Sequence, residues 1–191
     1  MHLSMLPHRR RSRKPQLLPA FSALSADSGF RKKFRAFVEA PCVRDVLVSL
    51  ASVATSIDSV EWVGSAFQAI AAKSEQGKRL LSTAEVRDAL VTMSLHVYSP
   101  LSGAAVANAF HTIITGEPRA QILFGVPPVR EALLHMITGA SRHTRSSASD
   151  PLFVQHMSRW VSSLVVNNTH NTTLFTTKKV RDGLVSNVST S

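Results

Sequence analysis

Val43-Arg44-Asp45-Val46-Leu47 begins the pattern that decides the fold, because the same arrangement of residues returns three more times. It recurs as Val86-Arg87-Asp88-Ala89-Leu90, as Val129-Arg130-Glu131-Ala132-Leu133 and as Val180-Arg181-Asp182-Gly183-Leu184. The first residues of successive copies are 43, 43 and 51 positions apart. A recurrence in the forties is typical of stacked pairs of α-helices, in which each unit contacts only its neighbours.

Apolar residues in each unit follow the spacing of amphipathic helices. In the first unit they fall at i, i+3, i+4, i+7 and i+11, on one helical face: Val43, Val46, Leu47, Leu50 and Ala54. A second helix has its apolar face at Val63, Ala66, Phe67 and Ile70. Both patterns recur 43 residues later. We therefore expect Leu47, Leu90 and Leu133 to take equivalent positions in one shared core.

Short polar residues and prolines indicate where the helices begin. Pro41 stands where a helix can begin, because a missing N–H costs nothing there. Either Asp58 or Ser59 is expected to cap the second helix of the first unit. Ser82 and Glu85 have the spacing of a capping box, in which Ser82 accepts from the backbone of Glu85.

The third unit is longer than the others by eight residues. Its additional length falls in Ser141–Asp150, which has no apolar period and predicts an exposed loop. Such an insertion is either a tolerated surface loop or part of a binding face. The helix after it is expected from Asp150 or Pro151 to about Val166, and residues 167–171 read as a turn.

Two regions follow from these patterns: residues 1–20 as a disordered basic tail and residues 21–191 as the repeat array. The expected units are 21–38 (partial), 39–81, 82–124, 125–175 and 176–191 (partial). Ser22-Ala23-Leu24 already keeps the register, 43 residues before Ser65-Ala66-Phe67. An array with a half unit at each end indicates either a fragment of a longer array or self-association through its ends, with a second copy docking there.

The array resembles the armadillo/HEAT superfamily of helical repeats. Val60–Ala72 is similar to the long third helix of an armadillo unit, Gly77–Ser82 to its short first helix, and the start at Pro127–Ala132 to that of HEAT units. The resemblance implies a right-handed α-solenoid of about three to four repeats. It also implies a non-catalytic scaffold for protein–protein interaction. Ser65 and Ala69 stand where import-type armadillo proteins carry Trp and Asn, so that peptide-binding ladder is absent.

The formal net charge of +10 is concentrated near the N-terminus. Half of it lies in the first twenty residues, which contain no acid: Arg9, Arg10, Arg11, Arg13 and Lys14. This run suits a nuclear localisation signal, a polyanion-binding arm or a plain solvated tail, and its Arg and Ser content suits a mitochondrial presequence. We expect an intracellular protein, nuclear or cytoplasmic, with the mitochondrion as the alternative. A nucleic-acid-associated function is the alternative to the scaffold.

Several other classes lack sequence support. No run of about 18 apolar residues predicts a membrane span. Cys42 is the one cysteine, so no internal disulfide forms. The chain has no Gly-rich phosphate loop and no Gly-x-Ser-x-Gly motif, so we expect neither an enzyme nor a cofactor. His111, His135 and His156 could approach one another in a stack, either as metal ligands or as ordinary helix-face residues.

An Arg followed by an acid is the polar feature that every unit keeps. Adjacent residues do not face each other on a helix, so each Arg is expected to pair with an acid of a neighbouring unit. The other interpretation is a row of arginines that binds an acidic protein partner. The candidate residues under both interpretations are Arg44, Arg87, Arg130 and Arg181.

Overall fold

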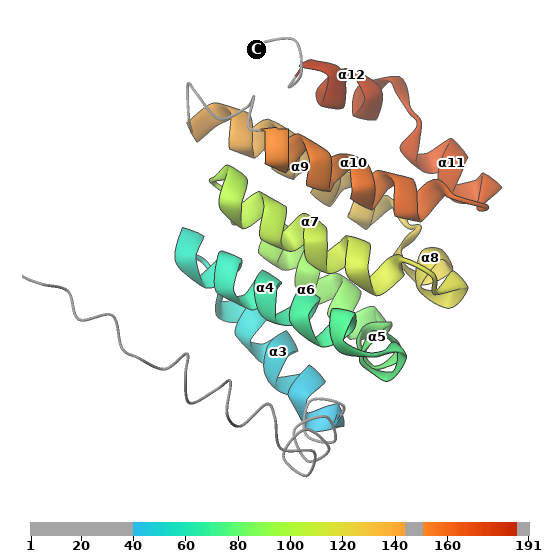
Figure 1. Cartoon of the computed structure of the whole chain (residues 1–191). Coiled ribbons are helices and arrows are strands. Elements are labelled where there is room, and N and C mark those ends of the chain that lie inside the picture. The colour runs from blue at the N-terminus through green and yellow to red at the C-terminus, as the bar shows by residue number, and fades with distance from the viewer. Residues whose placement is uncertain (1–39, 144–150, 187–191) are drawn as a thin grey trace, which may run out of the picture. The chain divides into compact units, whose positions relative to one another are not determined.

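The computed structural model describes residues 40–143 and 151–186, which form α-helices joined by short connections (Figure 1). No β-strand occurs within these two ranges, so the all-α prediction is confirmed for them. The helices are α3 (Pro41–Val53), α4 (Ile57–Lys73), α5 (Glu75–Leu81), α6 (Ala84–Ser94), α7 (Pro100–Ile114), α8 (Pro118–Phe124), α9 (Pro127–His143), α10 (Pro151–Val165), α11 (Thr169–Phe175) and α12 (Lys178–Ser186). The predicted tail 1–20, with its basic residues, and the partial unit 21–38 lie outside the described residues.

The longer helices lie in two rows (Figure 1). In row A, α3, α6, α9 and α12 pack consecutively, each against the next. In row B, α4 packs on α7 and α7 packs on α10. The short helices α5, α8 and α11 follow the row B helices in the chain and lead back to row A. Each helix of row A and row B therefore makes most of its contacts between helices with the preceding and following helices of its own row.

The core follows the recurring sequence pattern. Three leucines that are 43 residues apart are buried in one continuous cluster, as predicted: Leu47, Leu90 and Leu133. A second equivalent set is buried at the ends of the short helices: Leu81, Phe124 and Phe175. Within row B, the Phe110 ring of α7 stacks on Trp160 of α10 with centroids 4.2 Å apart, and it meets Phe124 of α8 edge-on at 5.9 Å. Each fully buried side chain of this size contributes about 1.5–3 kcal/mol relative to exposure.

Paired serines set the starts of α4 and α7. Ser56 Oγ accepts from the Ser59 N–H at 3.2 Å, and Ser59 Oγ accepts from the Ser56 N–H at 3.0 Å. Ser99 and Ser102 repeat this reciprocal cap 43 residues later. The prediction of Asp58 or Ser59 as the cap is therefore wrong. The cap lies at Ser56 because the reciprocal bond needs a hydroxyl at the third helical position, which Ser59 supplies.

The cap of α6 lies one residue later than predicted. Thr83 Oγ1 accepts from the Val86 N–H at 3.4 Å and is the N-cap residue. Ser82 instead donates to the carbonyl of Lys78 at 2.8 Å, at the end of α5. The hydroxyl of Ser82 is thus already used by the preceding helix. A hydrogen bond from its own backbone N–H, and then one from Thr83, lower the pKa of Glu85.

The apolar stripe of α3 is covered only in part. Val46 is 56% exposed and Leu50 is 45% exposed, although the pattern predicts both in the core. Their equivalents in α6 and α9 are buried: Ala89, Met93, Ala132 and Met136. The difference arises because α6 and α9 each pack against an earlier helix of row A, whereas α3 is the first described helix of that row.

The C-terminal units depart from two predictions. The predicted loop Ser141–Asp150 is helical through His143, and its residues 144–150 lie outside the described ranges. The predicted turn at 167–171 is instead the start of α11, with Asn168 as its N-cap. Asn171 is fully buried, and its Nδ2 donates to the carbonyls of Gln121 at 2.8 Å and Leu164 at 3.0 Å. The Asn171 amide therefore serves the last turns of α8 and α10, where helical carbonyls lack internal donors.

Candidate interaction surface

The arginine row consists of the four arginines of the recurring motif, and each pairs with the acid that directly follows it. The pairs are Arg44–Asp45 at 2.7 Å, Arg87–Asp88 at 2.7 Å, Arg130–Glu131 at 2.6 Å and Arg181–Asp182 at 3.6 Å. The prediction of pairing with acids of neighbouring units is therefore wrong. The side chains of adjacent helical residues leave the helix in different directions. The arginine side chain is long enough to bend along the helix surface and reach the carboxylate of the next residue.

Contact between units is made through a backbone carbonyl instead. Arg87 Nη1 donates to the carbonyl of Leu123 in α8, 3.3 Å away. The arginines of the first three motifs are mostly covered, with side chains 21–30% exposed, whereas Arg181 on α12 is 68% exposed. In those three units the acids are the more exposed partners. The binding of an acidic partner by the row stays a prediction.

An open groove of about 500 Å³ runs along row A. We name it the row A groove; it is lined by Val91, Leu95, Pro128, Glu131, Ala132, Leu134, His135, Thr138 and Lys179, from α6, α9 and α12. Its floor is apolar: Leu134 and Ala132 are buried, and Leu95 is 48% exposed. A shallow apolar groove that crosses several helices can accept apolar side chains from another chain.

Charged groups on the groove have fixed places. Glu131 is held at one side by Arg130, and Lys179 is exposed on α12. His135 Nδ1 lies 3.2 Å from the carbonyl of Ser94, a bond that joins α9 to α6 and orients the ring. The groove therefore combines an apolar floor with one carboxylate and one ammonium, which would orient a bound segment by charge.

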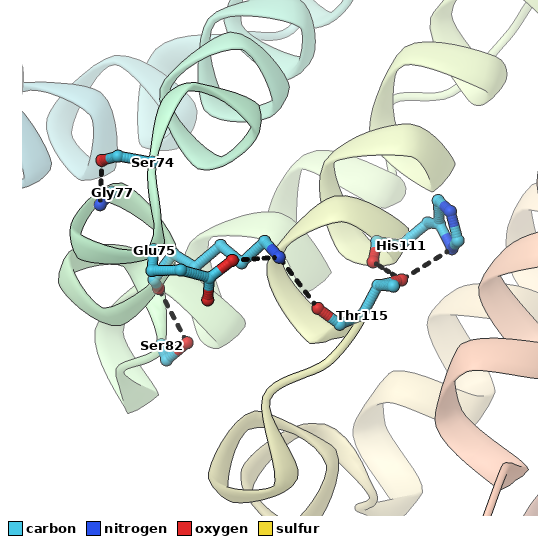
Figure 2. Close-up of polar contacts among 7 residues, drawn as sticks. Ser74, Glu75, Gly77, Ser82, His111 and Thr115 are labelled. Atoms are coloured by element: carbon cyan, nitrogen blue, oxygen red, sulfur yellow. Dashed lines mark hydrogen bonds and ion pairs between the residues drawn. The ribbon is translucent and has the colours of Figure 1, made fainter.

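A second polar arrangement joins α5 to the end of α7 (Figure 2). Lys78 Nζ donates to Glu75 Oε1 at 3.0 Å and to the carbonyl of Thr115 at 3.2 Å. Thr115 Oγ1 in turn donates to the carbonyl of His111 at 2.7 Å. Figure 2 shows these groups as one chain between consecutive units. They satisfy polar groups at the C-terminus of α7, so their role is structural.

His111 connects α7 to α10. Its ring lies beside a hollow of about 260 Å³, and Nδ1 is 3.2 Å from Thr115 Oγ1. Burial lowers the pKa of His111, and the positive charge of Arg159 lowers it further, against a backbone hydrogen bond at Arg159 that raises it. Within residues 40–143 and 151–186, no three His, Cys, Asp or Glu side chains are grouped to hold a metal ion.

The sequence motif did not reveal the row A groove. One signal was available: the residue after each motif is also apolar, at Val48, Val91, Leu134 and Val185. Val91 and Leu134 of this series line the groove. A pattern of apolar positions predicts which residues are buried, but a groove between helices depends on the sizes of the side chains that different helices contribute.

Comparison with known proteins adds no relative. No protein-family model matches the chain, and no curated protein or solved structure matches it. Among the described helices, none combines the length and apolarity that crossing a membrane requires.

Proposed function

We propose that this chain is a non-catalytic scaffold for protein–protein interaction, built as a right-handed α-solenoid of armadillo/HEAT-like repeats. The row A groove is the observation that carries this proposal, because an apolar groove shared by three helices is a surface for another protein chain. The equivalent positions of the leucines in row A support the repeat arrangement. Helical-repeat arrays commonly bind along such extended surfaces.

The chemistry of the groove defines the bound segment. Leu95, Ala132 and Leu134 favour an amphipathic helix that presents apolar side chains one turn apart. Glu131 favours a basic residue on that helix, and Lys179 favours an acidic residue. The partner is therefore a protein with an exposed amphipathic helix of mixed charge.

Affinity capture from cells with matched variants tests this proposal. Leu95→Glu places a charge on the apolar floor. The Leu95 side chain is 48% exposed, so the charge stays in contact with water and the variant should fold. Ile122→Glu on α8 is the control, because Ile122 is exposed outside the groove. Proteins retained by the wild type and by Ile122→Glu, but lost with Leu95→Glu, support the groove. Identical capture by all three chains contradicts it.

A nucleic-acid-associated protein is the second candidate function. Residues 1–39 carry nine Lys and Arg against two Asp and Glu, so the excess charge is concentrated there. Phosphate binding through this segment predicts retention on DNA or RNA that falls steeply with salt. Deletion of residues 1–20, which removes five of these nine basic residues, should weaken such retention and shift a nuclear fusion protein toward the cytoplasm. Retention that does not change with salt contradicts phosphate binding.

A further inference from the structure

An open hollow of about 440 Å³ lies where α5 ends and α8 begins. It is lined by Arg79 on α5, Ser82 at the C-cap of α5, Glu117 at the N-cap of α8 and Arg119 on α8. None of these residues lines the row A groove. The hollow therefore lies between two consecutive units, and the structure describes the residues on both of its sides.

Contacts between α5, α7 and the start of α8 fix the two sides of the hollow. Lys78 Nζ donates to the carbonyl of Thr115 at 3.2 Å and so joins α5 to the residue that follows α7 (Figure 2). Gly116 comes next with a φ of 77°, a left-handed conformation that glycine adopts without strain, and it turns the chain toward α8. The fold therefore sets the backbone positions that carry Arg79 and Arg119.

The arginines of the hollow differ from those of the arginine row. Each arginine of the row pairs with the acid that directly follows it. Arg79 and Arg119 are exposed, and neither guanidinium has an ion pair or a hydrogen bond among the described residues. The Ser82 hydroxyl is already used, because it donates to the carbonyl of Lys78 at 2.8 Å. The side-chain donors left for a ligand are the two guanidinium groups, which form short, charge-assisted hydrogen bonds with carboxylates.

The pair of arginines is not repeated at the next junction between units. The equivalent positions there are 43 residues after Arg79 and 51 residues after Arg119, and they hold Ile122 on α8 and His170 on α11. Features that serve the packing of every unit recur, as the buried leucines of row A do. Packing between units therefore does not require two arginines here, which leaves them free to bind another molecule.

We propose that this hollow binds the carboxylate of an acidic side chain from another protein chain, with Arg79 and Arg119 as its hydrogen-bond donors. Two guanidinium groups and the carboxylate of Glu117 give the lining a formal charge of +1, which one further carboxylate neutralises. A phosphorylated side chain carries about −1.5 to −2 charge at pH 7 and would meet repulsion from Glu117. A water molecule takes up about 30 Å³ of the liquid, so the hollow has room for a whole acidic side chain.

Nuclear magnetic resonance of the full chain with short probe peptides tests the proposal. The probe has blocked ends and one central glutamate in an otherwise uncharged sequence, and the same peptide with glutamine is its control. The Nε–H signals of Arg79 and Arg119 should shift with the glutamate peptide alone. Arg79→Gln and Arg119→Gln should each weaken binding about tenfold through the lost charge-assisted hydrogen bond. Arg159→Gln, which removes the same charge from α10 outside the hollow, should bind like the wild type.

Removal of the acid in the hollow gives a prediction of opposite sign. Glu117→Gln should tighten binding of the glutamate peptide about two- to fivefold, because a repulsive charge is lost. A phosphoserine peptide should bind the wild type no more tightly than the glutamate peptide does, and it should gain more from Glu117→Gln because it carries more charge.

Equal binding by the wild type and both arginine variants overturns the proposal. Tighter binding of the phosphoserine peptide to the wild type overturns the choice of a carboxylate and assigns the hollow to phosphoryl groups. Acetate that shifts the same signals as strongly as the glutamate peptide, at equal concentration, overturns the choice of a protein ligand and assigns the hollow to small carboxylates. None of these measurements involves the row A groove, so each outcome is separate from the test of the proposed function.

Discussion

The close approach of Gly125 to Asn171 allows a quantitative test of how α8, α10 and α11 are joined. A Cβ placed on Gly125 would lie 1.9 Å from Asn171 Oδ1, so an alanine there must displace the buried amide. Overpacking of this kind costs about 1–3 kcal/mol. Asn171→Ala instead removes two hydrogen bonds to carbonyls, each worth about 1 kcal/mol, so that it should cost about 2 kcal/mol.

The two substitutions should not add. With alanine at position 171, the space near residue 125 is free, so Gly125→Ala should cost little more in that background. The double variant should therefore lie close to Asn171→Ala alone, with a coupling of about 1–3 kcal/mol. Urea unfolding at 25 °C, followed by circular dichroism, measures each free energy. Thr173→Ala, exposed on the same helix, is the control and should stay within about 0.5 kcal/mol of wild type.

Additivity of the two changes within about 0.5 kcal/mol would refute this reasoning, because it would mean that the two residues do not meet. A neutral Asn171→Ala would separately show that the carbonyls of Gln121 and Leu164 do not need the amide.

Three further changes test other parts of the structure. Arg87→Ala should lower stability by about 1 kcal/mol through the lost bond between units, whereas Arg181→Ala, exposed on α12, should leave the melting temperature nearly unchanged. The lowered pKa of His111 means that, as the pH falls, the unfolded chain takes up the proton at this residue before the folded chain does, so the free energy of unfolding should be fully present above about pH 6.5 and fall below it. His111→Gln should reduce this dependence of the unfolding free energy on pH, measured by urea unfolding at several pH values from about 5 to 7.5. Leu90→Ala should cost about 2–5 kcal/mol by calorimetry, but Leu101→Ala, whose side chain is exposed, under about 0.5 kcal/mol.

Periodic apolar positions were enough to predict the longer helices and the main core, but not the start of α11, where a turn was predicted. Leu47, Leu90 and Leu133 are 43 residues apart in the sequence, lie on α3, α6 and α9, which pack consecutively, and are all buried. The stripe on α3 was the exception, since burial there requires a neighbour that the pattern does not supply. Val46 and Leu50 therefore show where the regularity of the described stack ends.

Side-chain conformation was the part that spacing could not predict. The motif places each Arg beside an acid, but does not show that Arg87 folds back to Asp88 while also reaching Leu123. Asn171 was predicted in a turn because Asn and Thr are common there, yet its amide is buried against two helix ends. The row A groove was missed for a related reason, because it depends on the relative sizes of residues from three helices.

The packing of each helix mainly on its row neighbours has a mechanical consequence. Helix α7 is covered by α4 on one side and α10 on the other, whereas α3 and α12 each have a row neighbour on one side among the described helices. Amide hydrogens should therefore exchange most slowly in α7 and progressively faster toward both ends. Under tension the terminal helices would detach first and the middle helices last, so the described part of the molecule would lengthen in steps.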